Sequence, residues 1–296
     1  MRPGATLNSK FAYCETMWKS GWTLPIHLRA PIDTGEPLRA SNLKIGSRFM
    51  TSRRSIVRLT LLFFFSFPLL RATADDWPIG PPDPIRLMDM VLVKGGCYMM
   101  GDTFGDGADE ERPAHEVCVK DFYLGKYPVT QMQWTGTMGT NPSVESHCGL
   151  TCPVENVSWN EVQEFVRKLG ERTGKTYRLP TEAEWEFAAR SAGKQEKWAG
   201  TASENELGDY AWYYSNSVFK SHPVGLKKPN GVGLYDMTGN VWEWTADWYD
   251  ADHKTRVVRG GSRLDNPRSA RASLRFRLEP GIRSIVIGLR CAGEIP

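Results

Sequence analysis

The chain has 296 residues, 41% of them hydrophobic, which is ordinary for a soluble globular protein. Its net charge of +3 is uneven, because residues 1–74 hold 11 Lys or Arg and 3 Asp or Glu, which leaves 26 basic and 31 acidic residues, a net charge of −5, in 75–296. A mildly acidic body gives no electrostatic reason for nucleic-acid binding, so we expect no nucleic acid partner.

An export signal is predicted near the N-terminus. Arg53 and Arg54 precede a run of twelve nearly all apolar residues, 59–70, and small residues follow at 72–74. Twelve residues span about 18 Å as a helix, less than the roughly 30 Å of a hydrocarbon core, so a cleaved signal is favoured over a membrane anchor. We therefore expect a signal peptide over 50–74 and a periplasmic or secreted protein without a stable membrane anchor, exported by the Sec or the twin-arginine route.

The segments on either side of the signal have different interpretations. Residues 1–49 show neither periodicity nor a motif, and a signal peptide should begin a protein, so we hypothesise that Met50 is the true start and that 1–49 are not translated. Residues 75–89 are a Pro-rich, extended lead-in. No second linker follows, which predicts one domain over 90–296, expected to be monomeric.

The first part of this domain is predicted to contain two strands and a short helix. A strand over 90–100 is broken by Gly95 and Gly96, and a Gly- and Asp-rich loop over 103–113 leads to a second strand over 116–123. A short helix over 129–138 would begin at Thr130 as its N-cap.

Two capping boxes predict the main helices. Ser158 with Glu161 starts an amphipathic helix over 158–169 that ends at Gly170 or Gly174. Thr181 with Glu184 starts the second, with Trp185, Ala188 and Ala189 on one face. On this second helix Glu182 and Glu186 are interpreted as a solvated face. From residue 192 onward Gly, Pro, Asn and Trp dominate, periodicity is weak, and ordered loop is expected.

Five cysteines remain after the signal. Cys148 and Cys152 close a short loop, and Cys97 and Cys118 lie in segments that both read as strands and could bridge neighbours, so both pairs are disulfide candidates with Cys291 left over. A metal site at Cys148 and Cys152 is disfavoured because no second Cys/His pair stands at zinc spacing. A redox-active loop is an open alternative, but a structural role is favoured.

Several longer motifs follow in a fixed order. The main ones are Tyr177-Arg178-Leu179-Pro180-Thr181-Glu182-Ala183-Glu184-Trp185, Asn230-Gly231-Val232-Gly233-Leu234-Tyr235-Asp236, Gly239-Asn240-Val241-Trp242-Glu243-Trp244, Arg259-Gly260-Gly261-Ser262 and Gly288-Leu289-Arg290. In order and spacing they resemble the formylglycine-generating-enzyme (sulfatase-modifying factor) domain family over about residues 90–293. The resemblance implies an α+β, C-type-lectin-like fold, rich in loops, with a small antiparallel sheet and two main helices.

The resemblance also implies a structural Ca²⁺ site. The matching positions are Asp236, Gly239, Val241 and Glu243, of which the glycine and the valine would contribute backbone carbonyls. Two carboxylates with carbonyl oxygens suit calcium. The alternative is that Asp236 and Glu243 merely cap turns.

The chain departs from the family where active members bind copper through two cysteines. Counting onward from Ser262, these positions hold Asp265 and Ala270. Because soft thiolates select Cu(I), we expect neither copper nor copper-dependent formylglycine synthesis. The surrounding segment holds six arginines, and with Ser262, Arg263 and Arg268 as groove candidates it could bind a small anionic ligand or a peptide. A solvated or ion-paired basic surface is the alternative.

Three functions follow, and whether the chain is an enzyme stays open. The favoured hypothesis is an exported oxidative maturation factor without copper and cysteine chemistry, resembling the family's pyoverdine-maturation relatives. The alternative is a non-catalytic, lectin-like module that binds a ligand or a peptide. Authentic sulfatase activation is least favoured because of Asp265 and Ala270.

Overall fold

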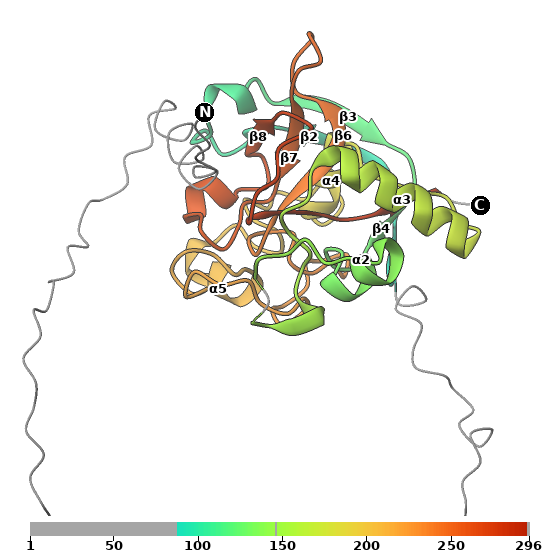
Figure 1. Ribbon diagram of the computed structural model, residues 1–296. Coiled ribbons are helices and arrows are strands. Elements are labelled where there is room, and N and C mark those ends of the chain that lie inside the picture. Colours follow the sequence, from blue (N-terminus) through green and yellow to red (C-terminus); the bar gives the residue numbers. More distant parts are fainter. Residues whose placement is uncertain (1–87, 146, 295–296) are drawn as a thin grey trace, which may run out of the picture. The chain divides into compact units, whose positions relative to one another are not determined.

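The computed structural model describes residues 88–145 and 147–294, drawn in colour in Figure 1. The predicted signal peptide, residues 1–49 and nearly all of the lead-in lie outside the described residues. Within these, ten strands combine with short helices and long ordered loops, so the fold is α+β as expected. No helix of the described part is long and apolar enough to cross a membrane.

One sheet joins the two ends of the domain. Its strand order is β1-β4-β10-β5, all antiparallel, with the bounds β1 Met90–Val93, β4 Phe122–Gly125, β10 Ala292–Gly293 and β5 Tyr177–Arg178. The central strand β4 therefore pairs with the first strand of the domain on one edge and with the last on the other. This pairing fixes both ends of the folded region on the same sheet.

A second four-stranded sheet lies in the region where the sequence predicts only loop. Its order is β8-β7-β6-β9, with the bounds β6 Trp242–Trp248, β7 Arg256–Arg259, β8 Arg275–Leu278 and β9 Ile287–Leu289. The described residues therefore form three small sheets rather than one, and they are antiparallel as expected except for the parallel pair β6 and β9. The sequence could not indicate β7, because the strand is buried along its whole length and shows no alternation of polar and apolar residues.

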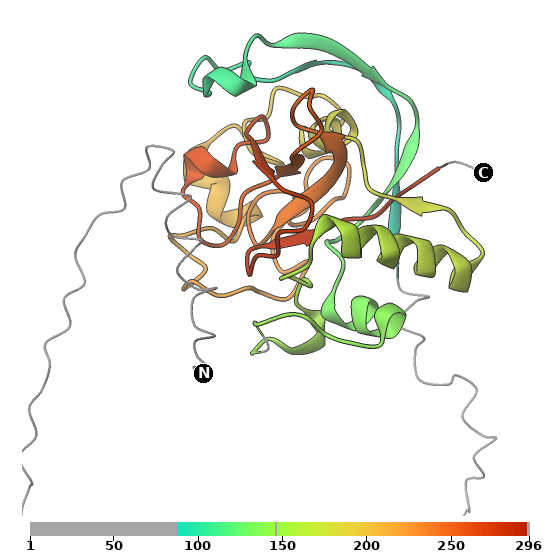
Figure 2. The same cartoon turned by 45° about the horizontal axis from the view of Figure 1, so that its top comes forward.

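Strands β2 (Gly96–Met100) and β3 (His115–Val119) form a separate hairpin that arches over the rest of the domain (Figure 2). Tyr98 attaches it, with its hydroxyl donating to the Ala183 carbonyl at 2.9 Å. The single strand predicted over 116–123 is thus two strands in different sheets. Asp121 lies at the corner between them, where its carboxylate accepts the Gly95 N–H at 2.8 Å.

The helices begin where the capping residues predict. Thr130, Ser158 and Thr181 each accept a hydrogen bond from the third residue of the helix that follows. The helices are α2 (Gln131–Met138), α3 (Trp159–Thr173), α4 (Glu182–Ala189) and the single turn α5 (Leu207–Tyr210). Helix α3 ends at Gly174 in the left-handed region, the later of the two stops that the sequence offers.

The apolar face of α3 fills the larger part of the core. Phe165 stacks on Trp134 of α2 with ring centroids 4.9 Å apart, and both rings are buried with Trp244 of β6 and Leu289 of β9. A second cluster surrounds Trp185 of α4. Large buried rings on α2, α4 and β6 therefore hold together a chain that has little regular structure.

Candidate functional site

Asp265, at the position that the motif spacing predicts for the first family cysteine, lies in a compact polar cluster. Asp265 Oδ2 accepts the Ser262 N–H at 2.9 Å, the Ser262 hydroxyl at 2.5 Å and the Trp242 Nε1–H at 2.9 Å. Burial raises the pKa of Asp265, although the hydrogen bonds from Ser262 and Trp242 oppose the shift. The half-buried carboxyl can therefore accept a proton or a hydrogen bond from a molecule bound beside it.

The position of the second family cysteine is part of the apolar interior. Ala270 is fully buried with Trp198, Leu207 and Ala211. The backbone passes very close at this point, since a Cβ on Gly261 would lie 2.8 Å from the Ala270 Cα, which requires glycine there. Asp265 and Ala270 thus have different surroundings, one polar and half-buried, the other apolar and closed.

Cys291 is the free cysteine of the described residues, and its surroundings are apolar. It is fully buried in the core cluster that contains Leu289, and burial raises the pKa of its thiol. Such a thiol is a poor thiolate donor. The side chains at positions 265, 270 and 291 therefore do not fit the pair of soft ligands that copper prefers.

The arginines of this segment are mostly not available to a ligand, which corrects the expectation of an anion-binding groove. Arg263 is fully buried, and its guanidinium donates to the carbonyls of Ile285 at 2.8 Å and Phe219 at 3.3 Å. Arg271 is buried in an ion pair with Glu111. Arg268 is exposed. The alternative of an ion-paired basic surface agrees better with the structure, although most of these ion pairs are buried.

The interpretation of Glu182 and Glu186 as a solvated face is wrong. Both are buried, and Glu186 pairs with Arg259 and with Arg190, the second at 2.9 Å. Glu182 binds Arg275 through both oxygens, at 2.9 and 2.5 Å. The partners Arg259 and Arg275 lie more than 70 residues further along the chain, so no local pattern could have indicated them.

Exposed apolar side chains occur on loops whose backbone binds the Asp265 carbonyl or the Arg263 side chain, and the sequence did not single them out. Val218 is 72% exposed and Phe219 56%, and Tyr214, Leu264 and Ile285 are exposed as well. These five residues are connected around Asp265 and Arg263: the Tyr214 N–H donates to the Asp265 carbonyl, and Arg263 binds the carbonyls of Phe219 and Ile285. We call this surface, with Asp265, the Asp265 face.

The expected calcium residues Asp236 and Glu243 are both buried. Burial raises the pKa of Asp236 to about 6, and its carboxylate accepts the Gly225 N–H at 2.8 Å without an ion pair among the described residues. The Glu243 carboxylate instead accepts from Arg290 at 2.8 Å and from Trp185 at 2.7 Å. The buried, unpaired Asp236 fits a cation, while Glu243 would have to share its oxygens. Calcium stays a prediction.

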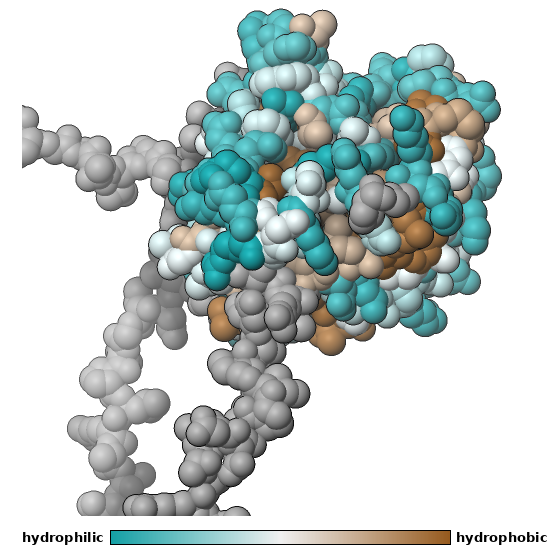
Figure 3. Space-filling model, turned by 90° about the vertical axis from the view of Figure 1, so that its right-hand side faces the viewer, coloured by the Kyte–Doolittle hydropathy of each residue, from teal (hydrophilic) through white to brown (hydrophobic). Residues whose placement is uncertain are grey.

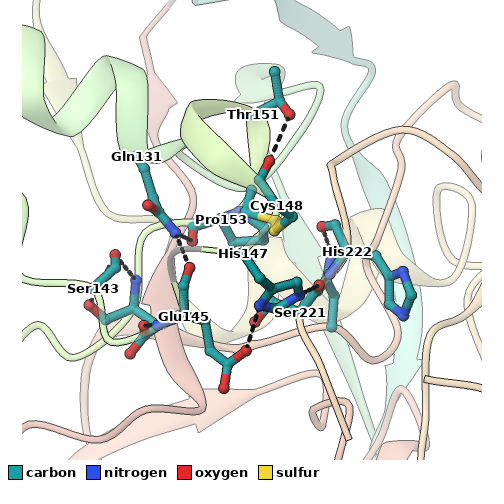
Figure 4. The surroundings of a disulfide bond; sticks show 12 residues. Gln131, Ser143, Glu145, His147, Cys148, Thr151, Pro153, Ser221 and His222 are labelled. Carbon is teal, nitrogen blue, oxygen red and sulfur yellow. Dashed lines mark hydrogen bonds and ion pairs between the residues drawn. A yellow bond between two sulfur atoms is a disulfide. The ribbon is translucent and has the colours of Figure 1, made fainter. Parts of the chain in front are cut away.

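Both disulfide predictions are confirmed. Cys97 and Cys118 lie opposite each other on the exposed β2–β3 hairpin. Cys148 and Cys152 close the short loop drawn in Figure 4, where the adjacent His147 binds the Glu145 carboxylate at 3.0 Å through Nδ1 and the Ser221 carbonyl at 3.0 Å through Nε2.

The fold and this site define a class of protein: an α+β domain with buried Glu–Arg pairs and long ordered loops, in which the two positions predicted for the family cysteines hold Asp265 and Ala270. The chain matches the "Sulfatase-modifying factor enzyme 1-like domain" over residues 80–295. It belongs to the sulfatase-modifying factor family, as the sequence motifs predict, and within it the chain is a non-standard member.

Relatives with opposite activities are about equally similar to this chain. The "Inactive C-alpha-formylglycine-generating enzyme 2" of Bos taurus is 30% identical over 277 residues, covering 70% of this chain and 88% of that protein. The "Formylglycine-generating enzyme" of Streptomyces coelicolor is 27% identical over 307 residues, covering 77% and 95%. Overall similarity therefore does not decide activity, and the residues at the site must.

Two solved structures confirm the fold. Treponema denticola variable protein 1 superimposes with a TM-score of 0.65 at 30% identity, over 70% of this chain and 95% of that one. PvdO from Pseudomonas aeruginosa does so with a TM-score of 0.59 at 27% identity, over 70% and 94%.

Proposed function

We propose that this chain is an exported, non-standard member of its family that binds a peptide segment on the Asp265 face and does not make formylglycine with copper. The observation that carries the proposal is the exposure of Val218 and Phe219 around a half-buried carboxylate that can accept a hydrogen bond. Large apolar side chains are rarely left together in water without a partner. Export rests on the signal pattern of residues 50–74.

The charges of this face favour a peptide over a small anion. The Arg263 guanidinium donates to the backbone carbonyls of Phe219 and Ile285 and lies 3.5 Å from the Glu145 carboxylate. The charged group on this face that a ligand would contact is therefore the acidic Asp265. A peptide offers apolar side chains to the rim and N–H donors to the carboxylate. An anion would meet the Asp265 carboxylate, and the neighbouring Arg263 is not free to pair with it.

Selection from a random peptide display library tests the binding. We expect enriched peptides with apolar residues, and a Val218→Ser/Phe219→Ser double variant should bind them at least tenfold more weakly at unchanged stability, because both side chains are exposed. Leu92→Ser, an exposed apolar position on β1, is the matched control. Failure to enrich any peptide, or equal binding by all three proteins, contradicts the proposal.

The second candidate is oxidative maturation of a bound molecule. The raised pKa of Asp265 favours it, because a raised pKa makes a carboxylate a better acceptor for a proton from a bound ligand. A cysteine-containing sulfatase peptide, incubated with the full chain and Cu(I) under air, should give no formylglycine by mass spectrometry. Formation of the aldehyde would contradict the absence of copper chemistry and leave sulfatase activation as the function.

A further inference from the structure

The two disulfides of the described residues differ in what they can contribute to stability. Cys97 and Cys118 are 21 residues apart and join two paired strands, whereas Cys148 and Cys152 are only 4 residues apart. A disulfide stabilises a protein mainly by restricting the unfolded chain, and this effect becomes smaller as the closed loop becomes shorter. The Cys148–Cys152 bond is therefore expected to contribute less to stability than the bond on the hairpin.

The loop 148–152 is held in place by bonds that do not involve sulfur. Gln131, the first residue of α2, binds both sides of the loop: its side-chain Nε2 donates to the Glu145 carbonyl at 2.8 Å, and its backbone N–H donates to the Cys152 carbonyl at 2.9 Å (Figure 4). The Thr151 carbonyl also accepts the Val224 N–H at 3.1 Å. These bonds can persist when the disulfide is reduced, so the two thiols would stay close together.

The two sulfur atoms of this disulfide differ in access. Cys152 is fully buried, whereas Cys148 is half-buried and is followed by the exposed residues Gly149 and Leu150. Thiol–disulfide exchange begins when a thiolate attacks one sulfur of the bond, and the other sulfur leaves. Because an attacking thiolate must reach the sulfur, the attack falls on Cys148, and Cys152 is the leaving group.

A histidine directly precedes Cys148 in the chain, and both nitrogens of its ring lie near acceptors. His147 Nδ1 is 3.0 Å from the Glu145 carboxylate, and Nε2 is 3.0 Å from the Ser221 carbonyl. When the ring is protonated, both nitrogens donate at once. The positive charge placed next to Cys148 in this way stabilises a thiolate on that residue, which makes it a better leaving group in the second step of exchange.

We propose that the Cys148–Cys152 disulfide oxidises a dithiol, such as a peptide with two cysteines. A thiolate of the dithiol attacks the Cys148 sulfur, the bond to Cys152 breaks, and its electron pair leaves on the Cys152 sulfur, which takes up a proton. The second thiol of the dithiol loses its proton and attacks the dithiol's own sulfur in the mixed disulfide. The dithiol closes to a disulfide, and Cys148 leaves as a thiolate that is then protonated. Two electrons and two protons thus pass to the protein.

The reaction does not depend on peptide binding at the Asp265 face, because Cys148 is accessible by itself. The test is a single-turnover reaction of the native chain with an equimolar reduced peptide that carries two cysteines, quenched by alkylation and mapped by mass spectrometry. The Cys148–Cys152 pair should be reduced about tenfold faster than the Cys97–Cys118 pair, with oxidation of the peptide at the same rate. Access alone predicts the opposite order, because Cys97 and Cys118 are both exposed. Equal rates, faster reduction of the hairpin pair, or no reduction at all overturns the proposal.

Two single variants identify the sulfur that is attacked. In Cys152→Ser, the remaining Cys148 should form a mixed disulfide with 5,5′-dithiobis(2-nitrobenzoate). In Cys148→Ser, the buried Cys152 should react about tenfold more slowly, as mapped by mass spectrometry. Equal reactivity of the two variants contradicts attack on Cys148.

A pair of double variants separates exchange from a structural role. Cys148→Ser/Cys152→Ser should no longer oxidise the peptide, and it should lower the Tm less than Cys97→Ser/Cys118→Ser does, because its disulfide closes the shorter loop. The hairpin variant is the matched control and should oxidise the peptide like the original chain. The opposite order of the two losses in Tm would show that the Cys148–Cys152 bond serves to hold the fold, and would overturn the proposal.

Discussion

Arg259 and Asp265 are six residues apart, yet they belong to two regions with opposite properties. Arg259 is fully buried between carboxylates of α4, with its guanidinium donating to Glu186 and to the Ser273 carbonyl. Asp265 is half-buried, and backbone hydrogen bonds link its segment to loops that carry exposed apolar side chains. The short segment 259–265 therefore begins in the interior and ends at a surface. A charged residue that stabilises the fold cannot be told from one that can bind a ligand by its charge in the sequence. Its burial and its ion pairs in the structure make the distinction.

The largest effect is expected from the buried region. Glu186→Ala removes the partner of Arg259 and Arg190 and the acceptor of the Gly101 N–H. The guanidiniums of Arg259 and Arg190 would then remain buried without the carboxylate that balances their charge. This should lower the free energy of unfolding by about 3–5 kcal/mol. Urea denaturation measures it. Glu171→Gln, at an exposed pair on α3, is the control and should change it by less than about 0.5 kcal/mol. Equal effects would show that burial of the network does not matter.

Calcium should act on a second buried carboxylate, Asp236. An ion that binds only the folded state at a hundredfold excess over its Kd stabilises by about 3 kcal/mol, so chelation should lower the Tm of the chain by several degrees. Asp236→Asn should abolish this difference. In chelator the variant should be no less stable than the original chain, because an unpaired buried carboxylate has been removed. A Tm that is the same with calcium and with chelator would contradict the calcium site.

Asp102 gives the buried region a measurable pH dependence. Burial opposes ionisation of Asp102, but the Gly107 N–H and Arg112, with further backbone donors, lower its pKa to about 2. A depressed carboxyl pKa stabilises the fold at pH values above the ordinary pKa near 4, and this contribution is lost as the pH falls toward about 2. Because solvent screens part of this interaction, Asp102→Asn should cost about 1 kcal/mol at neutral pH and little at pH 2. Denaturation at both pH values measures it, and an equal loss at both would contradict the assignment.

The elements that the sequence predicts are those whose signals are local. Thr130, Ser158 and Thr181 each cap a helix with residues three positions away, so all three starts were predicted correctly. Strand β7 and the pairing of Glu186 with Arg259 depend on residues far along the chain, and the sequence gives no sign of them.

At the candidate site, counting residues onward from the Arg-Gly-Gly-Ser motif identified Asp265 and Ala270. It could not predict which residues surround them. The exposure of Phe219 follows from a loop fixed by Arg263, and the anchoring of the loop 148–152 follows from its contacts with Gln131. Neither has a period or a spacing that could be recognised in one sequence.

The smallest effect on stability is expected at Asp265, the surface end of the segment 259–265. Asp265→Asn keeps an oxygen that can accept from Ser262 and Trp242, so the free energy of unfolding at neutral pH should change by less than about 0.5 kcal/mol. The raised pKa of Asp265 means that its ionised form opposes folding: stability falls as the pH rises from the ordinary carboxyl pKa through the raised one. Asn should remove that slope in pH-dependent denaturation.

The same variant should lose peptide binding, since an amide is a weaker acceptor than a carboxylate for a peptide N–H. The pair Asp265→Asn and Glu186→Ala then separates the two regions. Asp265→Asn should weaken peptide binding without changing the free energy of unfolding. Glu186→Ala should lower the free energy of unfolding, while the molecules that remain folded should bind the peptide nearly as well as the original chain. Loss of stability in Asp265→Asn comparable to that in Glu186→Ala would mean that Asp265 holds the fold as the buried Glu186–Arg259 pair does, and that the Asp265 face has no special place in ligand binding.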